Sequence, residues 1–303
     1  MARSIHDGLV GERRLVGTRY LADPALRAEY VTDIAPRTEA ALRRVLSQVA
    51  LPAPARVLDL GAGTGAAGRA ILAAHPGIDL ISVDKVKGPG VLVADLSRAV
   101  RPAGVKGQFD WIVAAHLLNE LATGLDAEAL LRLVRFWIGE YLSDGGTVIL
   151  VEPALRVTSR GLLRLRDNLL AGGLSVVAPC LFQGPCPALL RERDFCHDSA
   201  PAIVAGRSRV DFSYLVLSRN STSPTASADA FRVVSDPMKE KGRLRLFGCG
   251  PTGRILLTRL DREHSEANQG FGELGRGDLI RITLATPTGE GLRVVPDARC
   301  ERI

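Results

Sequence analysis

Apolar positions along the chain form two patterns, short continuous runs and longer stretches with helical spacing. The short runs predict strands at 56–60, 79–83, 91–94, 109–114 and 147–151. Helical spacing predicts helices at 65–74 and 127–141, between those strands. Strands that alternate with helices are typical of a parallel sheet with helices on both faces. The pattern therefore predicts a Rossmann-like α/β fold.

Other patterns flank this α/β core on both sides. Before it, 21–49 predicts two helices, with Asp23 as N-cap ahead of Pro24 and a break at Pro36. After it come a basic helix at 157–173, an irregular stretch that holds three cysteines, and strand-like runs separated by a Ser/Thr-rich linker. We expect an N-terminal helical segment (1–50), an α/β domain (51–222) with a cysteine-rich insertion (175–207), and a small antiparallel β-rich unit (223–303).

Composition narrows the class of protein. The 303 residues are 46% hydrophobic and 24% charged, which is enough apolar material for a full core and excludes disorder as the main state. No apolar run reaches the ~20 residues of a membrane-spanning helix, and the first residues lack the apolar region of a secretory signal. We therefore expect no membrane partner and a reducing compartment, in which the five cysteines remain free to bind metal.

Basic side chains outnumber acidic ones. The net charge is +6 and only five of the 39 basic residues are lysines, so arginine dominates. Arginine has forked donors that suit phosphate, although this excess could equally reflect codon usage. Arg160, Arg164 and Arg166 recur along the basic helix. They are the first candidates for contacts with an RNA backbone.

A glycine-rich turn follows the first predicted strand. Gly61, Gly63 and Gly65 in VLDLGAGTGAAGRA allow a tight turn and close approach to a ligand at a helix N-terminus. Asp59, two residues before the first glycine, disfavours an anionic dinucleotide and favours a cationic ligand. S-adenosylmethionine carries an ammonium and a sulfonium, and D-L-G-x-G-x-G resembles the first motif of class I S-adenosylmethionine-dependent methyltransferases.

Two acidic residues end the next strands. Asp84 follows Gly63 at the spacing of about 20 residues at which a carboxylate accepts hydrogen bonds from a ribose. Asp95 ends the third strand, where class I methyltransferases commonly place a side chain near the adenine. No Asn/Asp-Pro-Pro-aromatic run follows the fourth strand, so the catalytic residues stay unknown. His116 and Asn119, which stand there, are candidates for lining the pocket or for a structural role.

Four cysteines form the second candidate site. Cys180, Cys186 and Cys196 lie in the irregular stretch, and Cys249 follows in the β-rich unit. No CxxC pair exists, so the spacing matches neither a zinc ribbon nor a ferredoxin. Metal bound by all four would tie the irregular stretch to the β-rich unit, and zinc and iron both accept four sulfurs. Cys300, near the carboxyl end, is expected to be a bystander.

The chain also resembles one family as a whole. The segments HLLNEL, LSDGGTVILVEPALRVTSRGLLRLRDNLLA, VVAPCLFQGPCPALL, DFCHDS and RVVSDPMKEKGRLRLFGCGPTGR, with the glycine-rich turn, are similar to the mitoribosomal small-subunit methyltransferase-like family. The resemblance implies an S-adenosylmethionine-type fold, association with the maturing small ribosomal subunit, and a 4Fe-4S cluster on Cys180, Cys186, Cys196 and Cys249. The family's Pro-His after the first cysteine is replaced by Leu181-Phe182, although His197 beside Cys196 remains.

Three hypotheses about function follow. The first is an S-adenosylmethionine-binding, iron-sulfur methyltransferase-like protein acting on the small ribosomal subunit or its rRNA during assembly, as a monomer. It would be cytoplasmic in a bacterium and in the mitochondrial matrix of a eukaryote. The second is a catalytically idle RNA-binding assembly factor with the same fold, so enzymatic turnover stays uncertain. The third is a small-molecule methyltransferase with structural zinc.

Overall fold

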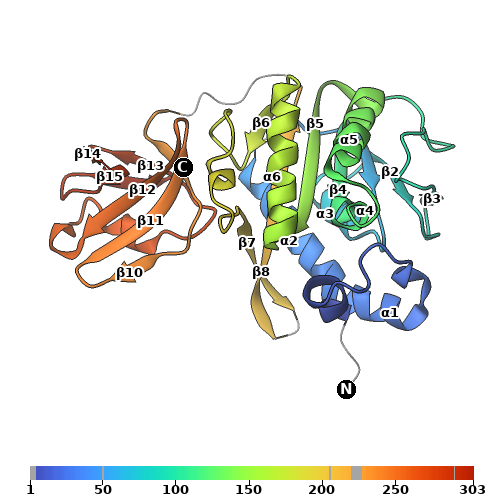
Figure 1. The fold of residues 1–303 in the computed structure, drawn as a ribbon, viewed down its shortest axis with the longest axis horizontal. Helices are drawn as coiled ribbons and strands as arrows, with labels where there is room; N and C mark the ends of the chain where they lie inside the picture. Colours follow the sequence, from blue (N-terminus) through green and yellow to red (C-terminus); the bar gives the residue numbers. More distant parts are fainter. Residues whose placement is uncertain (1–4, 50, 205, 220–226, 290) are drawn as a thin grey trace.

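Two β-sheets stand side by side with the cysteine-rich segment between them (Figure 1). This computed structural model describes residues 5–49, 51–204, 206–219, 227–289 and 291–303. The expected domain boundary at 222/223 lies outside the described residues. Among the described residues, none of the helices combines the length and apolar character needed to cross a membrane.

The first sheet has the order β3-β2-β1-β4-β5-β8-β6, and β7 also pairs with β8. Its first five strands are parallel, whereas β8 runs antiparallel to β5, β6 and β7. The bounds are β1 Arg56–Leu60, β2 Asp79–Asp84, β3 Val91–Val93, β4 Phe109–Ala115, β5 Leu142–Pro153, β6 Ser175–Ala178, β7 Asp198–Val204 and β8 Arg207–Ser218. The predicted α/β fold, with strands linked by helical crossovers, is confirmed.

Helices cover both faces of this sheet. They are α1 Pro24–Glu29, α2 Ala35–Gln48, α3 Ala66–Ala74, α4 Leu117–Leu121, α5 Ala127–Tyr141 and α6 Arg156–Ala171. Side chains alternate along a strand, so Val57 packs with α2 and α3 while Leu58 and Leu60 pack with α5 and α6. Asp59 shares the face of Val57 and is directed under α3. The strand register therefore fixes where this carboxylate lies.

Short π- and 3-10 segments complete the helical structure. The π segments are Asp7–Gly11 and Tyr30–Ile34; the 3-10 segments are Tyr20–Ala22, Pro187–Leu190, Asp261–Glu263 and Gln269–Glu273. The predicted cap of α1 is confirmed, because the Asp23 carboxylate accepts hydrogen bonds from the amides of Ala25 and Leu26. The predicted break at Pro36 is not a gap between two helices, because the π segment Tyr30–Ile34 runs directly into α2, whose second residue is Pro36.

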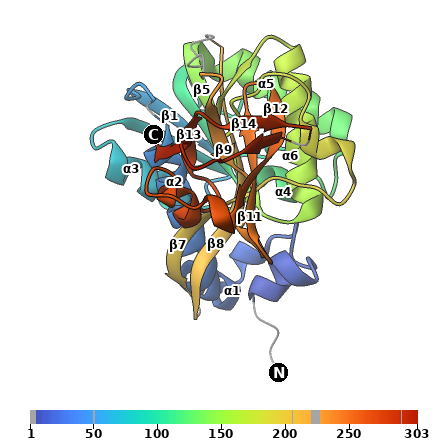
Figure 2. The same ribbon diagram turned by 90° about the vertical axis from the view of Figure 1, so that its left-hand side faces the viewer.

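The second sheet has the order β14-β15-β12-β11-β9-β13-β16, with β10 on β11 (Figure 2). The bounds are β9 Ala230–Val233, β10 Met238–Glu240, β11 Arg243–Gly250, β12 Gly253–Leu260, β13 Leu279–Thr283, β14 Thr286–Thr288, β15 Gly291–Arg293 and β16 Arg299–Arg302. It is antiparallel as predicted except for the pair of β12 and β15, which is parallel. Its core is separate and centres on Phe271, Leu246 and Ile280.

Polar contacts join the second sheet to the cysteine-rich segment. Arg232 of β9, only 6% exposed, donates to the carbonyl of Pro179, which follows β6 (3.3 Å), and to that of Gly277 in its own unit (2.8 Å). Arg254 of β12 forms an ion pair with Asp194 of the cysteine-rich segment (2.6 Å). Both contacts are more than half buried, so solvent screens them less than ordinary surface pairs.

The prediction of an irregular stretch over 175–207 is wrong at its two ends. Residues 175–178 form β6 and residues 198–204 form β7, and both strands pair with β8. The strands are short and carry mixed polarity, so their periodicity is weak; pairing with β8 supplies the hydrogen bonds that the local sequence does not indicate. The irregular part is confined to the residues between Ala178 and Asp198, which include the three cysteines.

The separate core of the second sheet leads to a first prediction. Leu246 is fully buried in it, so Leu246→Ala should lower the free energy of unfolding by about 2–5 kcal/mol. Leu190→Ala is the matched control, since Leu190 is 86% exposed and should change stability by less than about 0.5 kcal/mol. Urea unfolding measures both variants, and equal stabilities would contradict the assigned core.

Candidate functional site

A pocket opens at the carboxyl ends of β1, β2 and β4. The strand order reverses between β1 and β4, which is the place where open α/β sheets bind their ligands. The pocket has a volume of about 330 Å³, within the range of about 300–1,000 Å³ for small-molecule sites. Gly61, Gly63, Asp84 and Asp95 line it, so four of the six residues predicted for the cofactor meet here.

Asp84 holds the glycine-rich turn in shape. One carboxylate oxygen accepts a hydrogen bond from the Gly63 amide and the other accepts one from the Val86 amide, both at 2.8 Å. Gly61 and Gly63 have φ angles of 75° and 55°, which side chains other than glycine rarely adopt. A carboxylate has about four acceptor positions, so Asp84 keeps acceptor capacity for a ligand after these two bonds.

Asp95 lines the pocket from an exposed turn after β3, next to Asp84, whose carbonyl accepts the amide of Ala94 (2.9 Å). The Asp95 carboxylate accepts hydrogen bonds from the Ser97 hydroxyl (2.6 Å) and amide (3.0 Å), and these bonds lower its pKa. Arg98 forms an ion pair with it at 3.3 Å. Asp95 is therefore ionised and is positioned by its own turn.

Asp59 and Gly65 stand outside the pocket lining. Gly65 has a φ angle of 79° and begins α3. Asp59 is fully buried beneath α3, where the bare Gly68 lets the helix approach, and neither carboxylate oxygen has a hydrogen-bond partner by distance and angle. Burial, with the charge of Asp84, raises the pKa of Asp59 to about 7. Asp59 therefore lies below the turn and does not line the pocket.

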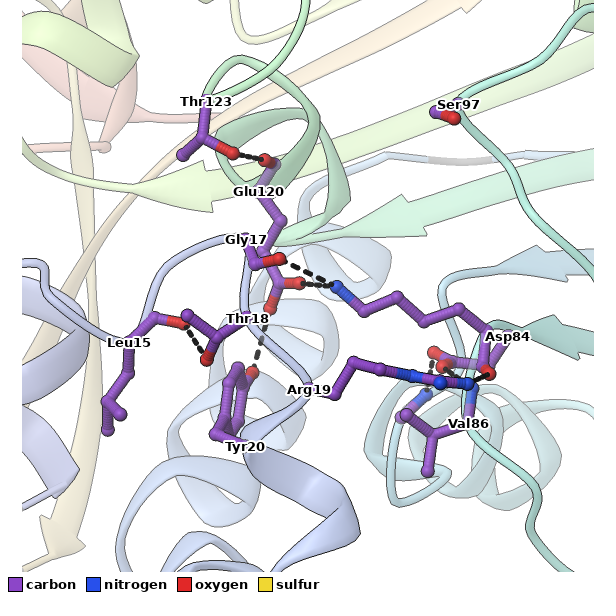
Figure 3. Close-up of polar contacts among 12 residues, drawn as sticks. Leu15, Gly17, Thr18, Arg19, Tyr20, Asp84, Val86, Ser97, Glu120 and Thr123 are labelled. Atoms are coloured by element: carbon purple, nitrogen blue, oxygen red, sulfur yellow. Dashed lines mark hydrogen bonds and ion pairs between the residues drawn. The ribbon is translucent and has the colours of Figure 1, made fainter.

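The N-terminal segment closes the other side of the pocket (Figure 3). Glu120 of α4 accepts hydrogen bonds from the Tyr20 hydroxyl (2.8 Å) and from the Lys85 ammonium (3.1 Å). The Gly17 backbone passes so close to Thr123 that any side chain at Gly17 would collide with it. Sequence reasoning missed Tyr20, Lys85 and Glu120, because they come from three distant segments and no motif links them.

His116 occupies the turn between β4 and α4. Its φ angle of 61° is left-handed, which is uncommon for a residue other than glycine and marks a backbone held by its surroundings. The His116 amide donates to the Val151 carbonyl (2.7 Å), and buried Glu152 accepts the first amides of α4, those of Leu118 and Asn119. Burial lowers the pKa of His116 to about 4, so its imidazole is neutral.

The four predicted cysteines line a separate cavity of about 60 Å³, the cysteine cavity, between α6 and the second sheet. Burial, together with the charges of Cys180 and Cys186, raises the pKa of Cys249 to about 12. Cys196 has a raised pKa from burial and from the other three cysteines. The described residues contain no group of three or more His, Cys, Asp or Glu side chains arranged as a metal site. Cys300 lies in β16 and does not line this cavity.

Two arginines of α6 hold the backbone of the cysteine-rich segment. Arg166, 1% exposed, donates to the carbonyls of Phe182 and Gly184, and Arg160, 8% exposed, donates to four carbonyls between 188 and 194. Asp167 accepts the Cys186 amide at 3.0 Å. The expectation that Arg160 and Arg166 bind RNA is wrong, because their guanidinium groups are buried and occupied. Arg164 alone of the three is exposed.

The buried Asp59 predicts a pH dependence of stability. The folded protein keeps its proton up to about pH 7, whereas an unfolded chain releases it near pH 4, so the folded state binds more protons in between. Wild-type stability should therefore fall as pH rises through this range. Asp59→Asn removes this contribution. As pH rises between the two pKa values, the free energy of unfolding of Asp59→Asn relative to wild type should therefore rise by about 1.4 kcal/mol per pH unit.

Urea unfolding at pH 5 and pH 8 measures the effect. Asp297→Asn, a change at an exposed carboxylate, is the control and should follow the wild-type profile. Parallel profiles for wild type and Asp59→Asn would contradict the raised pKa of Asp59.

Comparisons with known proteins give a family and several structural neighbours. The family model described as mitochondrial small ribosomal subunit Rsm22 matches residues 26–269. The plantazolicin methyltransferase BpumL in complex with SAH is 12% identical (TM-score 0.45) and covers 69% of this chain and 96% of its own. The pyocyanin biosynthetic protein PhzM is 14% identical (TM-score 0.44), with 72% of this chain and 70% of its own covered.

A protein from Listeria monocytogenes, described as a putative class I S-adenosylmethionine-dependent methyltransferase, is 11% identical (TM-score 0.37), with 61% of this chain and 60% of its own covered. No curated protein matches the chain significantly. The family match extends from α1 through the first sheet and the cysteine-rich segment into the second unit, and it ends before β13. Because it spans most of the sequence, the chain belongs to the family described as mitochondrial small ribosomal subunit Rsm22.

Proposed function

We propose that this chain is an S-adenosylmethionine-binding, methyltransferase-like protein that acts on the small ribosomal subunit or its rRNA during assembly. The observation that carries the proposal is the pocket at the strand-order reversal, where the glycine-rich turn and Asp84 stand together. The family match supports the ribosomal partner, since the family is described by the mitochondrial small ribosomal subunit. The protein would work in the bacterial cytoplasm or, in a eukaryote, in the mitochondrial matrix.

The charges of the pocket suit a sulfonium cation. Asp84, Asp95 and Glu120 line it against the single cation Lys85, and a cleft with one prevailing sign of charge concentrates ligands of the opposite sign. In this proposal the ribose lies on Asp84, the adenine near Asp95, and the amino-acid end over Gly61 and Gly63. Asp59 lies beneath the turn and would not contact the cofactor.

Methyl transfer asks little of the protein beyond alignment. The cofactor supplies the activated carbon, and holding the acceptor in line with it supplies much of the rate. The only titratable side chain that follows β4 directly is His116, which is neutral and a weak base. This favours, as the second candidate function, a catalytically idle assembly factor that uses the same fold to hold RNA.

The cysteine cavity is the proposed site of a 4Fe-4S cluster, because the four cysteines that line it supply the kind of ligand that such a cluster takes. Four thiols from both units face one cavity, and the Arg166 guanidinium lies near Cys180 and Cys186, whose charges raise its pKa against the effect of burial. A bound cluster would supply covalent cross-links between the cysteine-rich segment and the second sheet. We propose Cys180, Cys186, Cys196 and Cys249 as its ligands, with zinc as the alternative metal.

Cofactor binding tests the first part of the proposal. Asp84→Asn removes the charge of the predicted ribose acceptor and should weaken S-adenosylmethionine binding by about 1.5–3 kcal/mol, or tenfold or more. Isothermal titration calorimetry measures the affinity. Asp261→Asn, at an exposed residue of the second unit, should bind like wild type. Equal affinity in Asp84→Asn and wild type would remove Asp84 from the site.

The metal and the ribosomal partner are tested together. Anaerobically purified protein should be brown, and Cys249→Ser should lose visible absorption and iron and bind small ribosomal subunits less, because the two units lose their cross-link. Cys300→Ser is the matched control and should change neither property, since Cys300 is outside the cavity.

Absorption spectra, metal analysis and co-sedimentation give the three readouts. Stoichiometric zinc in a colourless protein would contradict the cluster but retain the ligands. Full metal content in Cys249→Ser would contradict the ligand set.

A further inference from the structure

A second cavity adjoins the pocket at the strand ends. Its volume is about 240 Å³, and it lies between the N-terminal segment, α2 and the first half of β8 in the β7–β8 hairpin, which projects beside the N-terminal helices (Figure 1). The cavity and the pocket share four lining residues: Tyr20, Tyr30, His116 and Glu120. A molecule in this cavity would therefore meet one in the pocket across a single layer of side chains.

Among the four shared residues, His116 has a ring nitrogen without a hydrogen-bond partner in the described part of the chain. A neutral imidazole has one donor and one acceptor nitrogen, and Nδ1 of His116 is buried without a partner among the described residues. The Val151 carbonyl and Glu152 fix the backbone of the turn that carries it. A buried polar atom with no partner is costly unless a ligand satisfies it.

The lining combines apolar walls with a cationic rim. Tyr20, Tyr30 and Phe212 present aromatic rings to the cavity. Arg37, Arg207 and Arg209 also line it, and burial together with the charges of Arg37 and Arg207 lowers the pKa of the neighbouring His6.

Acidic partners engage two of the three arginines. Arg37 is held by Asp33 at 2.6 Å and Arg209 by Asp211 at 3.3 Å, while Arg207 is exposed and forms no ion pair within the described ranges. Aromatic side chains stack on bases, and arginine pairs with phosphate.

We propose that this cavity receives one nucleotide of single-stranded RNA, with its base between the aromatic walls and its phosphate at Arg207 and Arg209. The volume lies below the range of whole drug-sized ligands, which suits one ring system whose backbone stays outside. The rim favours RNA over a protein side chain, because a peptide brings no phosphate for the arginines. The identification of the ligand as RNA rests on the proposed function.

Binding of mononucleotides tests the proposal. AMP, CMP, GMP and UMP are titrated by NMR, each against ribose 5-phosphate, with and without saturating S-adenosylhomocysteine. At least one mononucleotide should saturate and should bind about tenfold more tightly than ribose 5-phosphate, because only the base enters the cavity.

Three variants locate the binding site. Ala154→Phe fills the cavity and should abolish mononucleotide binding, since Ala154 lines this cavity and not the first pocket. The pair Arg207→Glu and Arg209→Glu should weaken binding about tenfold. Arg299→Glu, an exposed arginine of β16, is the matched charge control and should bind like wild type. Retained binding of S-adenosylhomocysteine by Ala154→Phe shows that the variant is folded.

Each other result overturns one of the two proposals. Unchanged mononucleotide binding by Ala154→Phe, affinity equal to that of ribose 5-phosphate, or saturation only by a short uncharged peptide overturns the nucleotide cavity and leaves the cofactor pocket standing. Absence of S-adenosylhomocysteine binding in wild type, with mononucleotide binding retained, overturns the cofactor pocket alone.

Discussion

The backbone hydrogen bonding of β8 determines where the cysteine cavity and the second cavity lie. This strand pairs with β5 on one side and with both β6 and β7 on the other. Because β6 and β7 are the two ends of the cysteine-rich segment, β8 anchors that segment at its entry and its exit. The same strand continues into the hairpin that carries Arg207 and Arg209, so the cysteine cavity and the second cavity are placed by one element.

Within those anchors, α6 replaces the hydrogen bonds that a segment without regular structure lacks. Buried backbone carbonyls need hydrogen-bond partners, and the guanidinium groups of Arg160 and Arg166 donate six hydrogen bonds to them. Burial of an arginine side chain is unfavourable unless its N–H groups donate hydrogen bonds. The guanidinium groups and the carbonyls therefore stabilise each other in the interior. The cysteines therefore face their cavity in a segment already ordered by α6.

Buried acidic side chains likewise stabilise the backbone, here in the turns at the carboxyl ends of the strands. Glu152 accepts the first amides of α4, and burial raises its pKa to about 8 against the opposing effect of those bonds. Asp84 accepts the amide of Gly63 in the glycine-rich turn and that of Val86 after β2. Each acidic side chain holds a turn that contains left-handed residues, and both turns line the pocket.

The sequence by itself determined the α/β order of elements, the glycine-rich turn with Asp84 and Asp95 beside it, and the set of four cysteines, because these depend on local periodicity and spacing. Only the tertiary structure decided that Asp59 faces α3 instead of the pocket, since one residue of strand register sets the face. It alone decided that Arg160 and Arg166 bind carbonyls and that Tyr20, Lys85, Glu120 and His116 enclose the pocket. The sequence does not show whether a charged side chain faces solvent or binds a buried backbone. Only the packing between distant segments distinguishes these two environments.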